Sequence, residues 1–176
     1  MRLLLLIGPP GAGKTSVLEA LMGLLDAEDA AYAAVEAESL ALVHPWPDND
    51  AAFAHLEFVA RSFRKRGYPT LLVTATVESS EYLERLRAAV PADEVLVARL
   101  EAPTTVLHDR VARREPPDWV GLPGLIERIE PLSTAMRVLP SVDLVLETDG
   151  ADARHIARRL RDALVSATRT SATGER

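Results

Sequence analysis

Short apolar runs alternate with helix-like stretches along most of this chain. The apolar runs indicate buried strands and fall at residues 3–7, 32–35, 70–74, 95–100 and 144–146. Apolar positions recur at helical spacing over residues 14–25, 51–66, 82–90, 104–114 and 152–167, with Asp50 as the expected cap of the second helix. The order predicts an α/β fold with three layers, in which helices cover both faces of a five-stranded parallel sheet.

The stretch from residue 115 to residue 140 interrupts this alternation. It contains five prolines and two glycines, so we predict no long regular helix there. Its place before the last strand suits a lid over an active site, although an ordinary irregular connection is the alternative. The polar residues 168–176 are expected to form a disordered tail, which leaves residues 1–167 as a single domain.

Composition narrows the class of protein. The 176 residues carry a net charge of −6, which argues against a general nucleic-acid binder. The chain has no cysteine, so disulfides, thiolate metal sites and cysteine nucleophiles are excluded. The apolar run near the N-terminus is too short for a signal-peptide core or a membrane span. We therefore expect a cytoplasmic protein that binds neither nucleic acid nor membranes, and no pattern indicates its oligomeric state.

A strong motif follows the first predicted strand. Residues 8–15 read Gly-Pro-Pro-Gly-Ala-Gly-Lys-Thr and match the pattern of a phosphate-binding loop, or P-loop. Lys14 is expected to bridge the β- and γ-phosphates of ATP, and the Thr15 hydroxyl to hold Mg²⁺. A glycine-rich turn without a ligand is the alternative. The predicted nucleotide-binding residues of the loop are Gly8, Gly11, Ala12, Gly13, Lys14, Thr15 and Ser16.

Other features separate the chain from GTPases and motor ATPases. Neither Lys14 nor Lys65 is followed two residues later by the aspartate that selects guanine, and no acidic pair follows the strand at residues 70–74. Glu36 and Glu38 end the second predicted strand and project to the same side, where the sheet binds ligands. A carboxylate there can accept a proton from an attacking hydroxyl, or it can be an ordinary solvated strand end.

These motifs resemble the small-molecule kinases of the P-loop class, in particular gluconate kinases and adenylylsulfate kinases, and more distantly shikimate kinase and chloramphenicol phosphotransferase. Their apolar-Asp-Gly-Asp segment corresponds to residues 35–38, where both aspartates are glutamates here. Residues 71–76 match their third strand, and Arg110 and Arg114 match their R-x-x-x-R helix. The resemblance implies the P-loop NTPase fold, and an assignment among AAA-type ATPases is compatible with the same loop.

The resemblance also implies roles for single residues. Glu36 is the first choice for the catalytic base and Glu38 the second, while Lys14 and Arg114 contact the transferring phosphate. Arg110 is expected to stack on adenine, and the turn with Asp149 and Gly150 to pass along the adenine edge.

The acceptor side of the site is less defined. A rigid turn with His44 and Trp46 follows the two glutamates, and the predicted lid adds Trp119 and Arg128. The function expected from these features is transfer of the γ-phosphoryl group of ATP to a hydroxyl of a small molecule. A nucleotide or nucleoside kinase is one alternative, and an ATP-binding switch with little transfer activity is another.

Overall fold

A single parallel sheet organises the molecule. The computed structural model describes residues 1–42, 44 and 49–172. The strands run in the order β2-β3-β1-β4-β5, and every neighbouring pair is parallel. The predicted five-stranded parallel sheet is therefore confirmed. The strands are β1 (Arg2–Ile7), β2 (Ala33–Glu36), β3 (Thr70–Ala75), β4 (Glu94–Glu101) and β5 (Leu144–Glu147).

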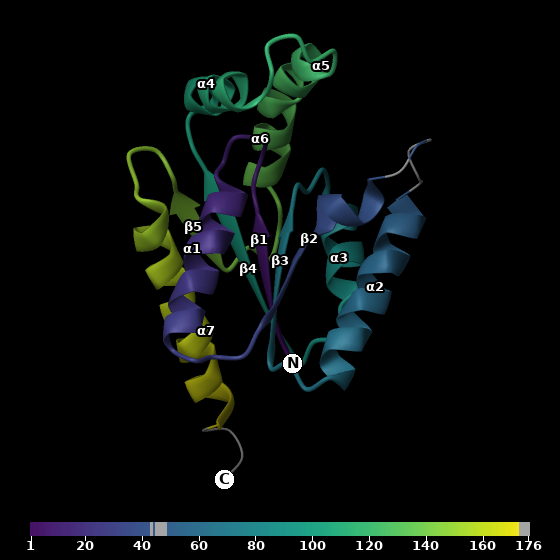
Figure 1. Ribbon diagram of the computed structural model, residues 1–176, viewed down its shortest axis with the longest axis vertical. Helices are drawn as coiled ribbons and strands as arrows, with labels where there is room; N and C mark the ends of the chain where they lie inside the picture. The colour runs from purple at the N-terminus through teal and green to yellow at the C-terminus, as the bar shows by residue number, and fades with distance from the viewer. Residues whose placement is uncertain (43, 45–48, 173–176) are drawn as a thin grey trace.

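Helices cover both faces of the sheet, so the predicted three layers are also present. Figure 1 shows α1 (Lys14–Ala27) and α7 (Ala153–Ala172) side by side on one face, and α2 (Asn49–Lys65) and α3 (Ser80–Ala88) on the other. Side chains of β1 alternate between these two cores. Leu3 and Leu5 belong to the core with α2 and α3, whereas Leu4 and Leu6 belong to the core with α1 and α7. This double burial explains the uninterrupted apolar run.

β1 lies at the centre of the sheet, where the connections diverge. It pairs with β3 on one side and with β4 on the other. α1 leads from β1 to β2 on the first side, whereas the chain after β3 crosses over to β4 on the second. Open α/β sheets bind ligands at such a point, beyond the carboxyl ends of the strands. The loop after β1 therefore has the position that ligand binding requires.

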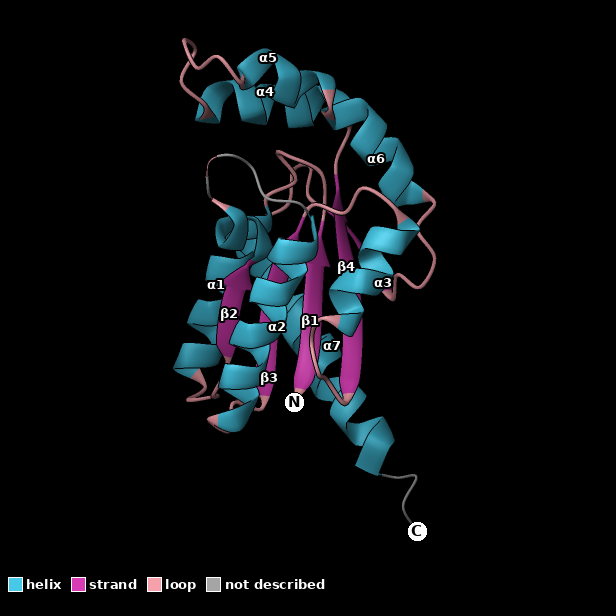
Figure 2. Ribbon diagram, turned by 90° about the vertical axis from the view of Figure 1, so that its right-hand side faces the viewer, coloured by secondary structure: helices cyan, strands magenta, loops and turns pink. Residues whose placement is uncertain are grey.

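Shorter helices lie beyond those strand ends. Figure 2 shows α4 (Thr104–Arg114) and α5 (Leu122–Glu127) across the end toward which the strand arrows point. α6 (Ile129–Arg137) follows α5 after Arg128 alone, and a 3-10 helix, η1 (Ala37–Ala41), follows β2. We call residues 115–140 the lid segment. No long helix forms in it, as predicted, but it is more regular than its proline content indicated. Pro123 and Pro131 fall in the first turns of α5 and α6, where a missing N–H costs no helical hydrogen bond.

Two helix ends differ from prediction. α7 continues to Ala172, so residues 168–172 are helical rather than a disordered tail, because neither glycine nor proline occurs before Gly174. α2 includes Asn49, and Asp50 lies in its first turn instead of capping it. A carboxylate in a first turn still interacts favourably with the helix dipole. None of the helices in the described part of the chain is long and apolar enough to cross a bilayer.

Candidate functional site

The loop between β1 and α1 has a backbone that requires glycine. Gly11 and Gly13 have φ angles of 80° and 88°, in the left-handed region that only glycine adopts readily. A Cβ atom at Gly11 would lie 2.6 Å from the carbonyl oxygen of Leu107 in α4, whereas one at Gly13 would meet nothing within 4 Å. Gly11 is therefore required by its conformation and by its packing, and Gly13 by its conformation alone.

Lys14 begins α1 and bends back over the loop. Its Nζ donates hydrogen bonds to the Gly8 carbonyl oxygen at 2.8 Å and to Thr76 Oγ1 at 3.0 Å. Burial lowers the pKa of Lys14; Glu38 opposes this shift and Arg114 adds to it. The ammonium is therefore held at the end of β1, partly removed from water, where an anion would gain most from its charge.

A cavity of about 420 Å³ lies against this loop and is suited to an anion. Its described lining residues include three cationic side chains, Lys14, Arg110 and Arg114, and no carboxylate. The first backbone N–H groups of α1 have no carbonyl partner within the helix, and the helix dipole adds positive potential there. Thr15 and Ser16 are exposed on this first turn, so their hydroxyls face the same space. We call this the phosphate cavity.

Arg110 joins the phosphate loop to the end of β5. Its guanidinium donates to Thr148 Oγ1 at 2.9 Å, to the Thr148 carbonyl oxygen at 2.7 Å and to the Gly11 carbonyl oxygen at 3.3 Å. It also lines both the phosphate cavity and an adjoining cavity of about 220 Å³. The adjoining cavity is mainly apolar and includes Val17 and Ile156, which suits the flat face of a nucleobase. Arg110 thus stands between the two cavities that a nucleotide would occupy.

Asp149 and Gly150 form the exposed turn after β5, and Gly150 has a φ angle of 65°. They stand beside the apolar cavity, but the residues lining it are their neighbours Thr148 and Ala151. Their predicted place at the adenine edge stays a prediction.

A third cavity, of about 260 Å³, opens on the other side of Lys14. We call it the acceptor-side cavity. Three residues line both this cavity and the phosphate cavity: Lys14, Thr15 and Arg114. The remaining lining residues come from the ends of β2 and β3, the loop and the lid segment: Pro10, Glu36, Glu38, Thr74, Thr76 and Leu125. The predicted meeting of the two glutamates with the phosphate loop is therefore observed.

The two glutamates have different surroundings. The Glu38 carboxylate accepts a hydrogen bond of 2.7 Å from the backbone N–H of Thr76, which ties the end of β2 to the end of β3. Glu36 is half-buried, and its carboxylate makes no hydrogen bond or ion pair with the part of the chain that the structure describes. Within the described part of the chain, both carboxylate oxygens of Glu36 are therefore without a hydrogen-bond donor.

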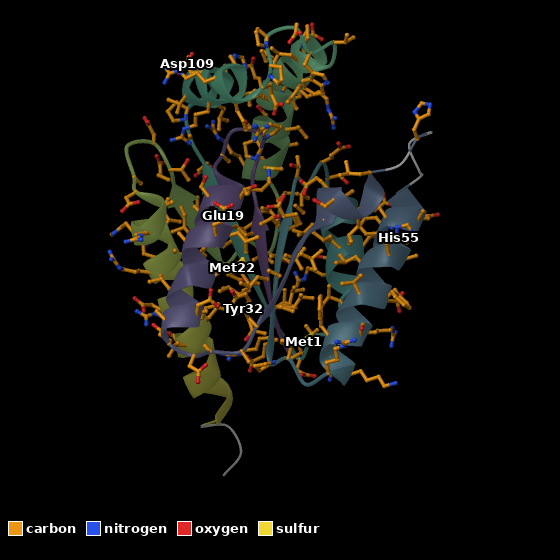
Figure 3. The ribbon with its side chains drawn as sticks, viewed as in Figure 1. Met1, Glu19, Met22, Tyr32, His55 and Asp109 are labelled. Carbon is orange, nitrogen blue, oxygen red and sulfur yellow. The ribbon has the colours of Figure 1, made fainter. Side chains whose placement is uncertain are left out.

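Several predicted acceptor contacts do not line these cavities. Arg128 forms an ion pair with Glu78, which lies in the loop after β3. The Trp119 ring rests against Gly121 and is 45% exposed. His44 is exposed, and Trp46 lies outside the described residues. His55, which was not predicted to contact the acceptor, is on α2, across the sheet from α1, with Nδ1 3.0 Å from the Leu40 carbonyl oxygen (Figure 3).

Sequence reasoning left several lining residues without a role, and three of them make contacts that matter for the site. Thr76 contacts both Lys14 and Glu38, Thr148 holds Arg110, and Leu125 reaches the acceptor-side cavity from α5. The signal available for both threonines was their position, since each directly follows a strand at the ligand-binding edge. Leu125 gave no signal, because an apolar residue in a proline-rich stretch is usually a packing residue.

A further cavity, of about 530 Å³ and so larger than these three, lies at the ends of β4 and β5. Its lining includes Arg99, Glu101 and Arg137, and these charges pair with one another at 3.3 Å and 3.9 Å. None of its described lining residues belongs to the phosphate loop. Size alone therefore does not identify the functional site.

Comparison with solved structures agrees with the fold. A sugar kinase from Janibacter superposes with a TM-score of 0.65 at 19% identity, covering 91% of this chain and 92% of its own. A gluconokinase from Sinorhizobium meliloti gives 0.64 at 18% identity, with 98% and 97% covered. An APS kinase from Mycobacterium tuberculosis, in complex with AMPPNP and APS, gives 0.64 at 17% identity, with 93% and 96% covered. The predicted P-loop fold of small-molecule kinases is confirmed.

Sequence comparison gives the family. No curated protein matches the chain. The family described as AAA domain matches residues 3–121, which is more than half of the sequence, and the protein therefore belongs to this AAA domain family.

Proposed function

We propose that the protein is an ATP-dependent phosphotransferase that moves the γ-phosphoryl group to a hydroxyl of a small molecule. The observation that carries this proposal is the row of three cavities along the P-loop. The apolar cavity shares Gly13, Ser16 and Arg110 with the phosphate cavity, which in turn shares Lys14, Thr15 and Arg114 with the acceptor-side cavity. A nucleobase, a chain of phosphates and an acceptor fit this order, because the chemical character of the lining changes in the same sequence.

The residues around the phosphate cavity fit ATP with Mg²⁺. Among the described residues, no three histidine or carboxylate side chains gather to hold a metal ion by themselves. The Thr15 hydroxyl is the group that would bind Mg²⁺, together with oxygens of the nucleotide. When bound, the ion neutralises phosphate charge. Lys14 and Arg114, which line both cavities, would bind the γ-phosphoryl group from two sides.

Glu36 is the group that supports transfer rather than binding alone. An acceptor hydroxyl in the third cavity would donate its proton to the Glu36 carboxylate while its oxygen bonds to the γ-phosphorus. The bond between the γ-phosphorus and the bridging oxygen breaks, and ADP leaves with that electron pair. Lys14 and Arg114 stabilise the negative charge that spreads over the transferring group, so positioning and electrostatics supply most of the acceleration.

The test is ADP release from ATP and Mg²⁺ in the presence of a panel of hydroxyl compounds. The proposal predicts strong stimulation by at least one compound. Glu36→Gln should reduce that stimulation by about 10²–10⁴-fold, the usual contribution of a general base, and leave ATP binding intact. Glu38→Gln is the matched comparison, because a glutamine oxygen still accepts the Thr76 N–H; its turnover should fall by far less. If Glu36→Gln keeps full stimulation, the assignment of the base is wrong.

A further inference from the structure

Lysine and arginine are absent from the part of the chain that brings Glu36 and Glu38 to the acceptor-side cavity. The chain contains 20 lysines and arginines, yet none occurs between Lys14 and Arg61. This stretch includes β2, η1 and most of α2. It does contain carboxylates, of which Glu36 and Glu38 reach the cavity. The lack of lysine and arginine is a property of the sequence, so it holds for residues 43 and 45–48 as well.

The cavity lining shows the same imbalance. Its only cationic residues among those described are Lys14 and Arg114, and both also line the phosphate cavity, where phosphate oxygens would neutralise them. The lid segment and α3 bring two further arginines toward this end of the molecule. Arg128 is already paired with Glu78, and Arg85 with Asp50. No cation of the described lining is therefore left for an acidic acceptor once ATP is bound.

The charge of Glu38 also affects the pKa of Tyr82. Burial raises the pKa of Tyr82, and the charges of Glu38 and Glu78 raise it further, whereas Arg85 acts in the opposite direction. Tyr82 belongs to α3 and packs against the Phe53 ring of α2 at a centroid distance of 4.9 Å. Tyr82 thus lies close enough to Glu38 for that carboxylate to influence it.

We infer that the acceptor is a small hydroxyl compound that carries an amino group, positively charged at neutral pH. This inference rests on the proposed phosphotransferase function. Glu36 takes the hydroxyl proton, and the exposed Glu38 carboxylate, which has lone pairs beyond its bond to Thr76, accepts a hydrogen bond from the ammonium. An acidic acceptor would instead place its charge against two carboxylates, which costs affinity. The volume of about 260 Å³ is at the lower end for ligand sites and favours a small molecule.

The test compares acceptors that share a skeleton and differ in charge. One set is glucosamine, glucose and gluconate; the other is ethanolamine, ethylene glycol and glycolate. Stimulation of ADP release is measured for each at pH 7, and calorimetry measures their binding in the presence of AMPPNP and Mg²⁺. In at least one set, the amine should exceed its neutral counterpart in kcat/KM by about tenfold or more, since hydrogen bonds to charged groups are strong. The acid should be the poorest of the three.

Variants locate the effect. Glu38→Gln should reduce the preference for the amine by about tenfold, mainly through KM, because it removes the charge and keeps the hydrogen bond to Thr76. Glu19→Gln makes the same change of charge on α1, which lies on the face of the sheet opposite α2 and α3 (Figure 3). This variant should leave the preference for the amine unchanged.

The outcomes separate the two proposals. Stimulation by neutral or acidic compounds in preference to their amines overturns the inference and leaves the phosphotransferase function standing. Binding of the amines that depends on Glu38, without release of ADP, supports cation selectivity and overturns the transfer function. If the amines neither bind nor stimulate, the inference is wrong.

Discussion

Gly11 offers a quantitative test of the loop geometry. Gly11→Ala introduces a methyl group at a residue with a φ of 80°, 2.6 Å from the Leu107 carbonyl oxygen. The left-handed backbone costs an L-residue about 1–2 kcal/mol. Ordinary contact begins at 3.4 Å, so α4 or the loop must also retreat by roughly 0.8 Å (3.4 − 2.6). Overpacking of that kind costs about 1–3 kcal/mol, which gives a total of about 2–5 kcal/mol.

Gly13→Ala is the matched control. Gly13 has a similar φ of 88°, but an added Cβ meets nothing within 4 Å. It should therefore lose only the conformational part, about 1–2 kcal/mol. The difference between the two variants isolates the contact with Leu107 at about 1–3 kcal/mol. For a chain of this size, that difference corresponds to a Tm lower by roughly 2–12 °C for Gly11→Ala than for Gly13→Ala.

The assay is thermal and urea unfolding of both variants without nucleotide, so that weakened ligand binding does not enter the comparison. Equal stabilities for the two variants, or a more stable Gly11→Ala protein, would refute the close approach of α4 to the phosphate loop.

Three further predictions follow from single contacts. Burial lowers the pKa of Lys14, so the folded chain loses this proton below the value of 10.5 that applies when unfolded. Between the folded and the unfolded pKa of Lys14, the unfolded state binds more protons than the folded state. The unfolding free energy of the wild type, relative to that of Lys14→Met, should therefore increase as the pH rises toward 10.5. Urea unfolding measures this difference, and a difference that stays constant with pH contradicts the burial of Lys14. Arg110→Lys should raise the KM for ATP nearly as much as Arg110→Ala, by about tenfold, because a lysine does not reproduce the fork that holds Thr148 and Gly11; recovery by lysine would show that charge alone matters. Glu78→Gln removes the exposed ion pair with Arg128 and should change the free energy of unfolding by less than about 1 kcal/mol. Hydrogen exchange across α5 and α6 should become faster. Unchanged exchange would show that the ion pair does not hold the lid segment.

Sequence patterns predicted most of the fold because two physical signals are local. The run in β1 is apolar throughout because both faces of that strand are buried, and the helices repeat apolar residues on one face only. The glycines and Lys14 of the phosphate loop are equally local, since a tight turn and an anion site need those residue types at that spacing.

What the sequence left open depends on contacts between distant segments. Whether Glu36 or Glu38 is free depends on the backbone N–H of Thr76, which comes from another strand. The sequence suggested Arg128 as a possible acceptor contact, but in the structure Arg128 pairs with Glu78, which is fifty residues away in the chain. The prolines of the lid segment were misleading for a different reason: proline breaks a helix interior but is accepted in a first turn, and the pattern alone does not say where each helix begins.

The central claim is transfer of the γ-phosphoryl group under the control of Glu36. The most direct measurement follows label from γ-³²P ATP into an added acceptor, for the wild type and for Glu36→Gln. We expect labelled acceptor and an equal amount of ADP with the wild type, and a loss of about 10²-fold or more in Glu36→Gln with ATP binding retained. Equal labelling by both proteins, or ATP binding with no labelled product from any acceptor in the panel, would contradict it.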